Sequence, residues 1–181
     1  MQNTLQINDR VAVNKIPFLA KSIKRGDVVV FRDPANWLPI PLDEPASNKY
    51  IAKVKEVLVF SGVIPNPAKQ FLVKRVIGVA GDKIICCDKD GALTINGKST
   101  NEPYIFAGNK PSELDFNVTV PEGKIWVMGD HRGASADSRY HQDDVNNGMV
   151  PVSKVTGRVF GIIWPFSNFG FVSSQDPLST K

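Results

Sequence analysis

Cysteine and histidine are scarce in this chain, which has two of each among its 181 residues. Cys86 and Cys87 are adjacent, so no Cys-x-x-Cys spacing exists, and the sequence argues against a structural zinc site. Adjacent cysteines bridge each other only with strain. The prediction is therefore two half-buried thiols on a strand.

Long apolar runs and basic runs are also missing. No stretch reaches the ~18 residues that a membrane-spanning helix needs, and the polar residues 1–5 are not typical of a signal peptide. The 22 basic and 18 acidic residues are scattered and leave a net charge of +4, so no nucleic-acid partner is expected. A mildly basic surface would suit an anionic membrane face.

What is present has ordinary globular composition, with 42% hydrophobic residues in short β-rich runs separated by Gly, Pro, Asn and Asp. The expected strands contain Val11 and Val13 and then residues 28–31, 71–79, 84–85, 93–95, 118–120, 125–128 and 155–163. Helical spacing occurs at residues 50–60, and Asn96 with Gly97 predicts a tight turn. These patterns predict a mainly β fold with barrel-like or Greek-key connections and one short helix.

Lys74 lies within the run at residues 71–82. Side chains of a strand alternate between faces, so Lys74 shares one face with Leu72 and Val76, while Arg75 lies on the other. Apolar neighbours on both faces predict a strand that is covered on both sides. Desolvation would lower the pKa of the Lys74 ammonium, and a partly neutral lysine can act as a general base. The alternative is a lysine that extends along a sheet edge to water.

A second polar segment, residues 129–139, has the composition of a loop. If the chain is extended after Gly133, the side chains of Ser135, Asp137 and Arg139 project to one side. Asp137 and Arg139 could then form an ion pair, and Ser135 could hydrogen-bond to a nearby amine. The alternative is an ordinary polar surface loop.

Two other kinds of site are open. Ser135, His131 and Asp137 could form a Ser-His-Asp triad, although they lie within seven residues of one another and known triads draw on separate segments. The candidate ligands of a metal site are His131, His141, Asp143 and Asp144. Their spacing matches no helical His-x-x-x-His pattern, so no metal is expected.

Four segments, in order, resemble the signature motifs of type I signal peptidases. Residues 1–5 are similar to Ser-Met-x-Pro-Thr-Leu without its serine, and residues 26–31 are similar to a Gly-Asp-hydrophobic-Val strand. Residues 74–82 resemble Lys-Arg-Val-x-Gly-x-x-Gly-Asp, and residues 129–139 resemble Gly-Asp-Asn-Arg-x-x-Ser-x-Asp-Ser-Arg. One motif alone is weak evidence, but four in the right order are specific.

The resemblance implies a catalytic domain over residues 1–170, with residues 83–125 as a small subdomain or hairpin insertion and residues 171–181 as a polar tail, which we expect to be disordered. It implies a signal-peptidase/LexA-like β-barrel-type fold and a location at the cell membrane, with the catalytic domain on the extracytoplasmic side. The implied partners are the lipid surface and signal peptides of exported preproteins with Ala-x-Ala sites, bound as an added strand. No cofactor is implied.

The resemblance also implies roles for single residues. Lys74 is the general base, Ser135 orients its amine, and Asp130, Asp137 and Arg139 support them. The residues implied to bind substrate are Met1, Thr4, Leu5, Leu72 and Val73. The nucleophilic serine is expected directly before Met1, so the chain as written should not hydrolyse peptides.

Asn3 and His131 depart from the family pattern, which usually has Pro and Asn there. Two explanations of the missing serine are open: Met1 is an internal methionine with the serine and a membrane span upstream, which we expect, or the protein is a pseudo-enzyme that binds preproteins. Two other functions are open as well. A LexA-like self-cleaving repressor domain would need a DNA-binding domain upstream, and in a plain β-rich binding module Lys74 would be an ordinary surface lysine.

Overall fold

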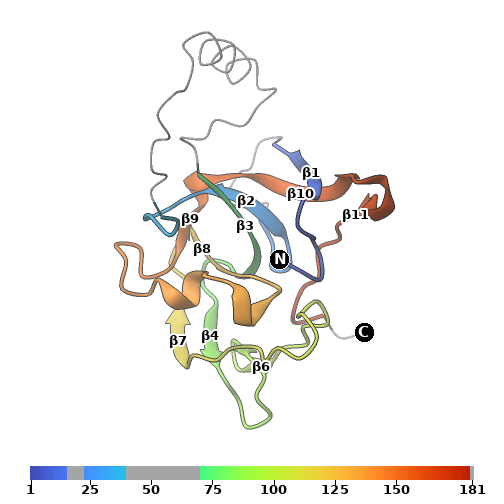
Figure 1. Cartoon of the computed structure of the whole chain (residues 1–181). Helices are drawn as coiled ribbons and strands as arrows, with labels where there is room; N and C mark the ends of the chain where they lie inside the picture. The colour runs from blue at the N-terminus through green and yellow to red at the C-terminus, as the bar shows by residue number, and fades with distance from the viewer. Residues whose placement is uncertain (16–22, 40–69, 180–181) are drawn as a thin grey trace.

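The computed structural model describes residues 1–15, 23–39 and 70–179 (Figure 1). The helix predicted at residues 50–60 lies outside these residues. The described ranges contain β-strands and short 3₁₀ turns, and all their strand pairs are antiparallel. The predicted mainly β class is therefore confirmed. Within the same ranges, no helix has the length and apolar character needed to cross a bilayer.

The larger sheet has seven strands, in the order β1-β10-β2-β3-β8-β9, with β11 also paired to β10. Its strands are β1 (Arg10–Asn14), β2 (Val28–Arg32), β3 (Phe71–Gly78), β8 (Lys124–Met128), β9 (Val150–Pro151), β10 (Val155–Trp164) and β11 (Gly170–Phe171). Strand β3 pairs with β2 on one side and with β8 on the other, so it is an interior strand. This places Lys74, opposite Val29, inside the sheet rather than at its edge.

A second sheet, shown below the first in Figure 1, has the strand order β6-β5-β4-β7. Its strands are β4 (Lys83–Cys86), β5 (Thr94–Ile95), β6 (Lys98–Ser99) and β7 (Phe116–Thr119). All four fall within residues 83–125, whose independence as a subdomain stays a prediction. Asn96 and Gly97 join β5 to β6 with φ angles of 53° and 79°, which confirms the expected tight turn.

Strand β3 is covered on both faces, as predicted. Val76 is buried in one hydrophobic cluster together with Val29 and Val127 of the neighbouring strands. Ile77 is buried in another cluster, between the two sheets, which also contains Trp126. Because side chains alternate along the strand, Lys74 starts from the same face as Val76, while Arg75 starts from the face of Ile77.

The prediction of two cysteine thiols is wrong. Cys86 and Cys87 are joined to each other by a disulfide bond. Strand β4 ends at Cys86, so Cys87 lies outside the strand and the alternation of faces does not separate the two side chains.

The expectation of a disordered tail is wrong for the residues that the structure describes up to 179. The Gln175 amide donates to the Gly26 carbonyl at 3.3 Å, and the Asn101 amide donates to the Pro177 carbonyl at 2.8 Å. Gly26 has a φ of 84°, and a Cβ there would overlap the backbone of Gln175. The polar composition gave no indication of this order, because backbone amides and carbonyls can be hydrogen-bonded whatever the side chains are.

Candidate active site

Lys74 and Ser135 meet although 61 positions separate them in the sequence. The Lys74 ammonium donates a hydrogen bond of 2.8 Å to Ser135 Oγ. Ser135 is buried and Lys74 is half-buried. Burial is the main cause that lowers the pKa of Lys74; the nearby Asp137 carboxylate raises that pKa, and the Arg139 guanidinium lowers it further. The site therefore favours a neutral amine more than water does, and a neutral amine can accept a proton.

Ser135 lies between two 3₁₀ turns, η2 (Arg132–Ala134) and η3 (Ser138–Tyr140). The condition that the chain is extended from Gly133 to Arg139 is therefore met only in part: Ser135 and Asp137 have extended backbone, and 3₁₀ turns flank them. The cause is capping: Asp137 accepts from the Arg139 amide and starts η3. The turns aim the Ser135 hydroxyl at β3.

Asp137 and Arg139 form the ion pair that the sequence suggested. Nε and Nη2 of Arg139 donate to the two carboxylate oxygens at 2.9 Å each, and both side chains are fully buried. The same carboxylate accepts from the Gly129 amide at 2.9 Å, which ties the end of β8 to the segment that carries Ser135. Ser138, which the sequence analysis missed, adds a second tie by accepting from the Val127 amide at 3.0 Å.

Gly129 leaves the space that the Ser135 hydroxyl occupies. A Cβ at residue 129 would overlap Ser135 Oγ and would lie 2.7 Å from Ser135 Cβ and 3.8 Å from Lys74 Nζ. The Gly129 backbone cannot easily retreat, because its amide is bound to Asp137 and its carbonyl accepts from Arg132 Nε at 3.1 Å.

We therefore expect Gly129→Ala to push Ser135 away from Lys74 and to lower the free energy of unfolding by about 1–3 kcal/mol, as overpacking does. Chemical denaturation measures the stability, and a crystal structure of the variant measures the distance between Lys74 Nζ and Ser135 Oγ. Gly133→Ala is the matched control, because a Cβ there meets nothing closer than 3.7 Å. Equal, small effects of both changes would contradict this explanation.

Residues 1–5 form a turn beside the Lys74–Ser135 pair. The amides of Thr4 and Leu5 donate to the Met1 carbonyl at 3.1 and 2.9 Å. Burial lowers the pKa of the Met1 α-amine, and the charge of Lys74 lowers it further, whereas Asp130 and Asp137 raise it. The backbone nitrogen of Met1 thus lies within the electrostatic reach of the site.

Asp130 and Arg75 hold this turn in place through the side chain of Thr4. Nε and Nη2 of Arg75 donate to the Asp130 carboxylate at 2.9 and 2.8 Å, and both residues are buried. The Thr4 hydroxyl donates to Asp130 and accepts from Arg75 Nη2 at 3.1 Å. The Arg75 guanidinium also lies 4.1 Å from the centre of the Tyr104 ring. Charge-assisted hydrogen bonds of this kind hold the turn in one position.

The residues that the resemblance implied for substrate binding separate into two groups. Met1, Leu5 and Val73 line one pocket of about 330 Å³. Thr4 instead points to Asp130, and Leu72 is buried in the core with Val76. The pocket therefore uses the opposite face of β3 from Leu72, because Val73 and Leu72 alternate.

Neither histidine contacts the Lys74–Ser135 pair in the hydrogen bonds and ring contacts of the described residues. His131 Nδ1 donates to Gln2 Oε1 at 2.7 Å, and its ring stacks on Phe106 with the ring centres 4.3 Å apart. The Asp137 carboxylate is taken up by Arg139 and Gly129, so the structure does not assemble the triad considered for His131. His141 stacks on Trp37, and over the described ranges no three His, Cys, Asp or Glu side chains converge as metal ligands would.

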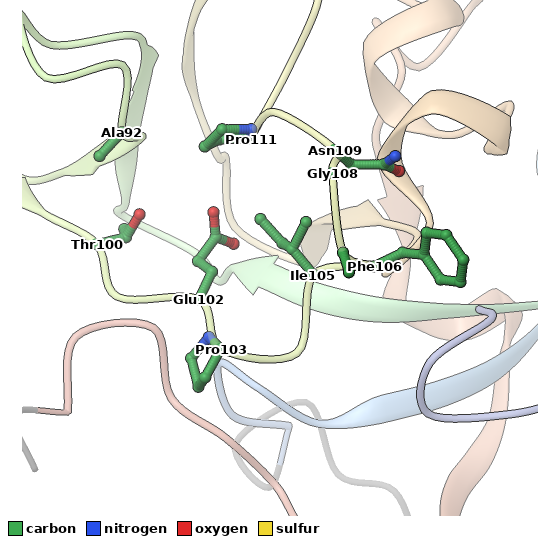
Figure 2. Close-up of a pocket in the computed structure, with 10 residues that line it drawn as sticks. Ala92, Thr100, Glu102, Pro103, Ile105, Phe106, Gly108, Asn109 and Pro111 are labelled. Atoms are coloured by element: carbon green, nitrogen blue, oxygen red, sulfur yellow. The ribbon is translucent and has the colours of Figure 1, made fainter.

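A further pocket, of about 340 Å³, lies beside this site (Figure 2). Its lining residues are Ala92, Thr100, Glu102, Pro103, Ile105, Phe106, Ala107, Gly108, Asn109 and Pro111. Glu102, on its wall, is paired with the buried Arg132. The loop that forms the pocket is fixed to the site segment, since the Phe106 amide donates to the Asp130 carbonyl at 2.9 Å and Asn109 Oδ1 accepts from the Gly133 amide at 3.0 Å.

Comparison with known proteins matches residues 1–164 to the family described as signal peptidase, peptidase S26. A probable signal peptidase I of Mycobacterium leprae is 39% identical over 189 residues, covering 93% of this chain and 65% of the relative. Signal peptidase I of Mycobacterium tuberculosis H37Rv is 38% identical over 185 residues, covering 94% and 62%. A signal peptidase I crystal structure from Enterococcus faecalis V583 is 25% identical with a TM-score of 0.47, covering 76% of this chain and 96% of the other.

Proposed function

The chain belongs to the signal peptidase family, peptidase S26, and on this premise we propose that it is the catalytic domain of a serine endopeptidase that removes signal peptides from exported preproteins. The chain spans less than two thirds of the length of the two mycobacterial relatives, and the activity is proposed for a protein that contains this chain together with a serine before Met1. The observation that carries the proposal is the desolvated Lys74 amine and its 2.8 Å hydrogen bond to the buried Ser135 hydroxyl.

The nucleophile in this proposal is a serine bonded directly to the nitrogen of Met1. Its hydroxyl would lie next to Lys74, which takes the hydroxyl proton as the oxygen attacks the scissile carbonyl and later gives that proton to the leaving amine. Ser135 holds the lysine amine in position through its hydrogen bond. Asp137 and Arg139 hold Ser135 through the segment they fix.

The substrate would bind as an extended strand, with a small side chain in the pocket lined by Met1, Leu5 and Val73. No cofactor enters this chemistry, because the lysine itself carries the proton.

The test is cleavage by the longer protein. With a serine directly before Met1, it should release a mature protein whose first residue follows Ala-x-Ala, as mass spectrometry would show. Replacing that serine with alanine should abolish cleavage and leave signal-peptide binding intact. Binding without cleavage by the unsubstituted longer protein would contradict the proposal and identify a pseudo-enzyme.

We also propose that the domain contacts a lipid surface, on the extracytoplasmic side of the membrane. Six large apolar side chains are exposed on β10, on β11 and on the segment between them: Phe160, Ile163, Trp164, Phe166, Phe169 and Phe171. Phe171 is 87% exposed and Phe166 is 75% exposed. The rings of Trp164 and Phe166 contact each other, with their centres 5.0 Å apart. Exposed apolar side chains that gather on a surface often mark an interaction site, and aromatic side chains are typical of membrane interfaces. The net charge of +4 favours anionic lipids.

Replacing Phe166, Phe169 and Phe171 with serine should lower binding to anionic phospholipid vesicles by at least about tenfold, because each buried Phe contributes on the order of 1.5–3 kcal/mol. Cosedimentation of the chain with vesicles measures this. Val145→Ser is the control, because Val145 is 89% exposed but lies outside β10, β11 and the segment between them. Equal binding by the triple variant and the control would exclude this lipid contact.

A further inference from the structure

The turn at residues 1–5 is anchored by side chains at three successive positions. Gln2 accepts from His131 Nδ1 at 2.7 Å, and Asn3 Nδ2 donates to the Tyr104 carbonyl at 3.0 Å. Thr4 is bound by Asp130 and Arg75. The anchors come from β3, which carries Arg75, and from the segments around residues 104 and 130. The Phe106 amide links these two segments through the Asp130 carbonyl. The turn thus rests on a preformed support rather than on its own backbone bonds alone.

The backbone conformation of Asn3 explains why the turn at residues 1–5 depends on hydrogen bonds from side chains. Its φ is 96°, a value that Asn adopts more readily than most residues and that the proline ring excludes. A rigid proline therefore cannot fix this turn in its present conformation. Hydrogen bonds from neighbouring segments supply the rigidity instead.

Gln2 is the side-chain anchor nearest to Met1, and its partner His131 is itself held. The His131 ring stacks on the Phe106 ring with an interplanar angle of 19°. Figure 2 shows the Phe106 ring projecting away from the rest of the pocket lining, so it is free to serve as the platform for His131. Stacking fixes the plane of the imidazole and thereby the direction in which Nδ1–H points.

We propose that His131 is a positioning residue: held against Phe106, it binds Gln2 and so fixes the turn at residues 1–5 and the residue bonded to Met1. As regards the reaction, this inference rests on the proposed function, since the residue bonded to Met1 is the proposed nucleophile. His131 takes no proton from it and touches no reacting atom. Its contribution is to hold the hydroxyl at the distance from Lys74 that proton transfer requires.

The first test uses the chain as it is. His131→Phe keeps a ring to stack on Phe106 but removes the donor, and Gln2→Leu removes the acceptor. Each change should speed hydrogen exchange at the Thr4 and Leu5 amides by about three- to tenfold, the size of one lost hydrogen bond. The melting temperature should change little. Asn117→Ala, an exposed change on the second sheet, is the control. Unchanged exchange at both amides would overturn the proposal.

The second test uses the longer protein. Each single change should lower kcat by about three- to tenfold with KM unchanged, and the double variant should lose no more than the worse single one, because both remove the same hydrogen bond. Additive losses, or an unchanged kcat in a protein that cleaves, would overturn the positioning role. If the unsubstituted longer protein does not cleave, the proposed function fails, while hydrogen exchange still decides whether His131 holds the turn.

Discussion

Replacing Lys74 with alanine is expected to lower the rate of signal-peptide cleavage by the longer protein by about 10²- to 10⁴-fold, the usual contribution of a general base. Lys74→Arg should fail to a similar extent, because a guanidinium stays protonated and cannot accept a proton. Ser135→Ala should cost less, about tenfold, because it removes one hydrogen bond that orients the amine. Initial rates on one preprotein, measured side by side, give these ratios.

The control for this series is Lys83→Ala, because Lys83 has an exposed side chain on the second sheet. Its rate should equal that of the unsubstituted protein. A His131 variant should keep at least about a tenth of the rate, since it loses one hydrogen bond. A dead His131 variant beside a largely active Lys74→Ala variant would show that a histidine, and not Lys74, is the base.

The largest effect on stability is expected from Asp137→Ala. This change leaves the Arg139 guanidinium, which is fully buried, without its carboxylate partner and also removes the acceptor of the Gly129 amide. Removing one partner of a buried ion pair lowers the free energy of unfolding by about 3–5 kcal/mol. This is a large part of the total free energy of unfolding of a domain, which is roughly 5–15 kcal/mol. Thermal and chemical unfolding should both show the loss.

Asp143→Ala is the matched control, because Asp143 is exposed and lies six positions further along the chain. Surface changes of this kind usually alter stability by no more than about 0.5 kcal/mol. Adding Arg139→Met to Asp137→Ala should restore part of the loss, because it removes the unpaired buried charge. Equal stability of the Asp137 and Asp143 variants would show that the ion pair does not support the site.

Local patterns in the sequence predict the strands, and they single out Lys74 and Ser135, the two residues joined by the hydrogen bond at the centre of the site. The alternation around Lys74 predicted a strand covered on both faces, and β3 is such a strand, with Val76 and Ile77 in separate hydrophobic clusters. The spacing of Ser135 and Asp137 singled out the segment that meets it. Each of these inferences needed only neighbours a few positions away.

The sequence could not predict which distant polar groups pair. Arg75 and Asp130 are 55 positions apart, and Arg132 and Glu102 are 30 apart, and nothing local in the sequence assigns either carboxylate to its arginine. The family resemblance implied that Thr4 binds substrate, and nothing in the sequence around Thr4 indicates that its hydroxyl bonds to the buried Arg75–Asp130 pair. The polar composition of residues 172–179 predicted disorder, but backbone hydrogen bonds join this segment to Gly26 and Asn101.

The most direct test of the central claim is the titration of Lys74 in the longer protein, measured beside the pH dependence of cleavage. Nuclear magnetic resonance of the lysine ε-carbon gives the pKa, and kcat/KM at each pH gives the profile. A general base works only when neutral, so the rate should rise with pH as Lys74 loses its proton, and the midpoint of that rise should match the measured pKa. Both values should lie below 10.5, the ordinary value for lysine, because burial disfavours the ammonium. A Lys74 pKa at or above 10.5, or a rate that rises at a pH where Lys74 does not titrate, would contradict its role as the base.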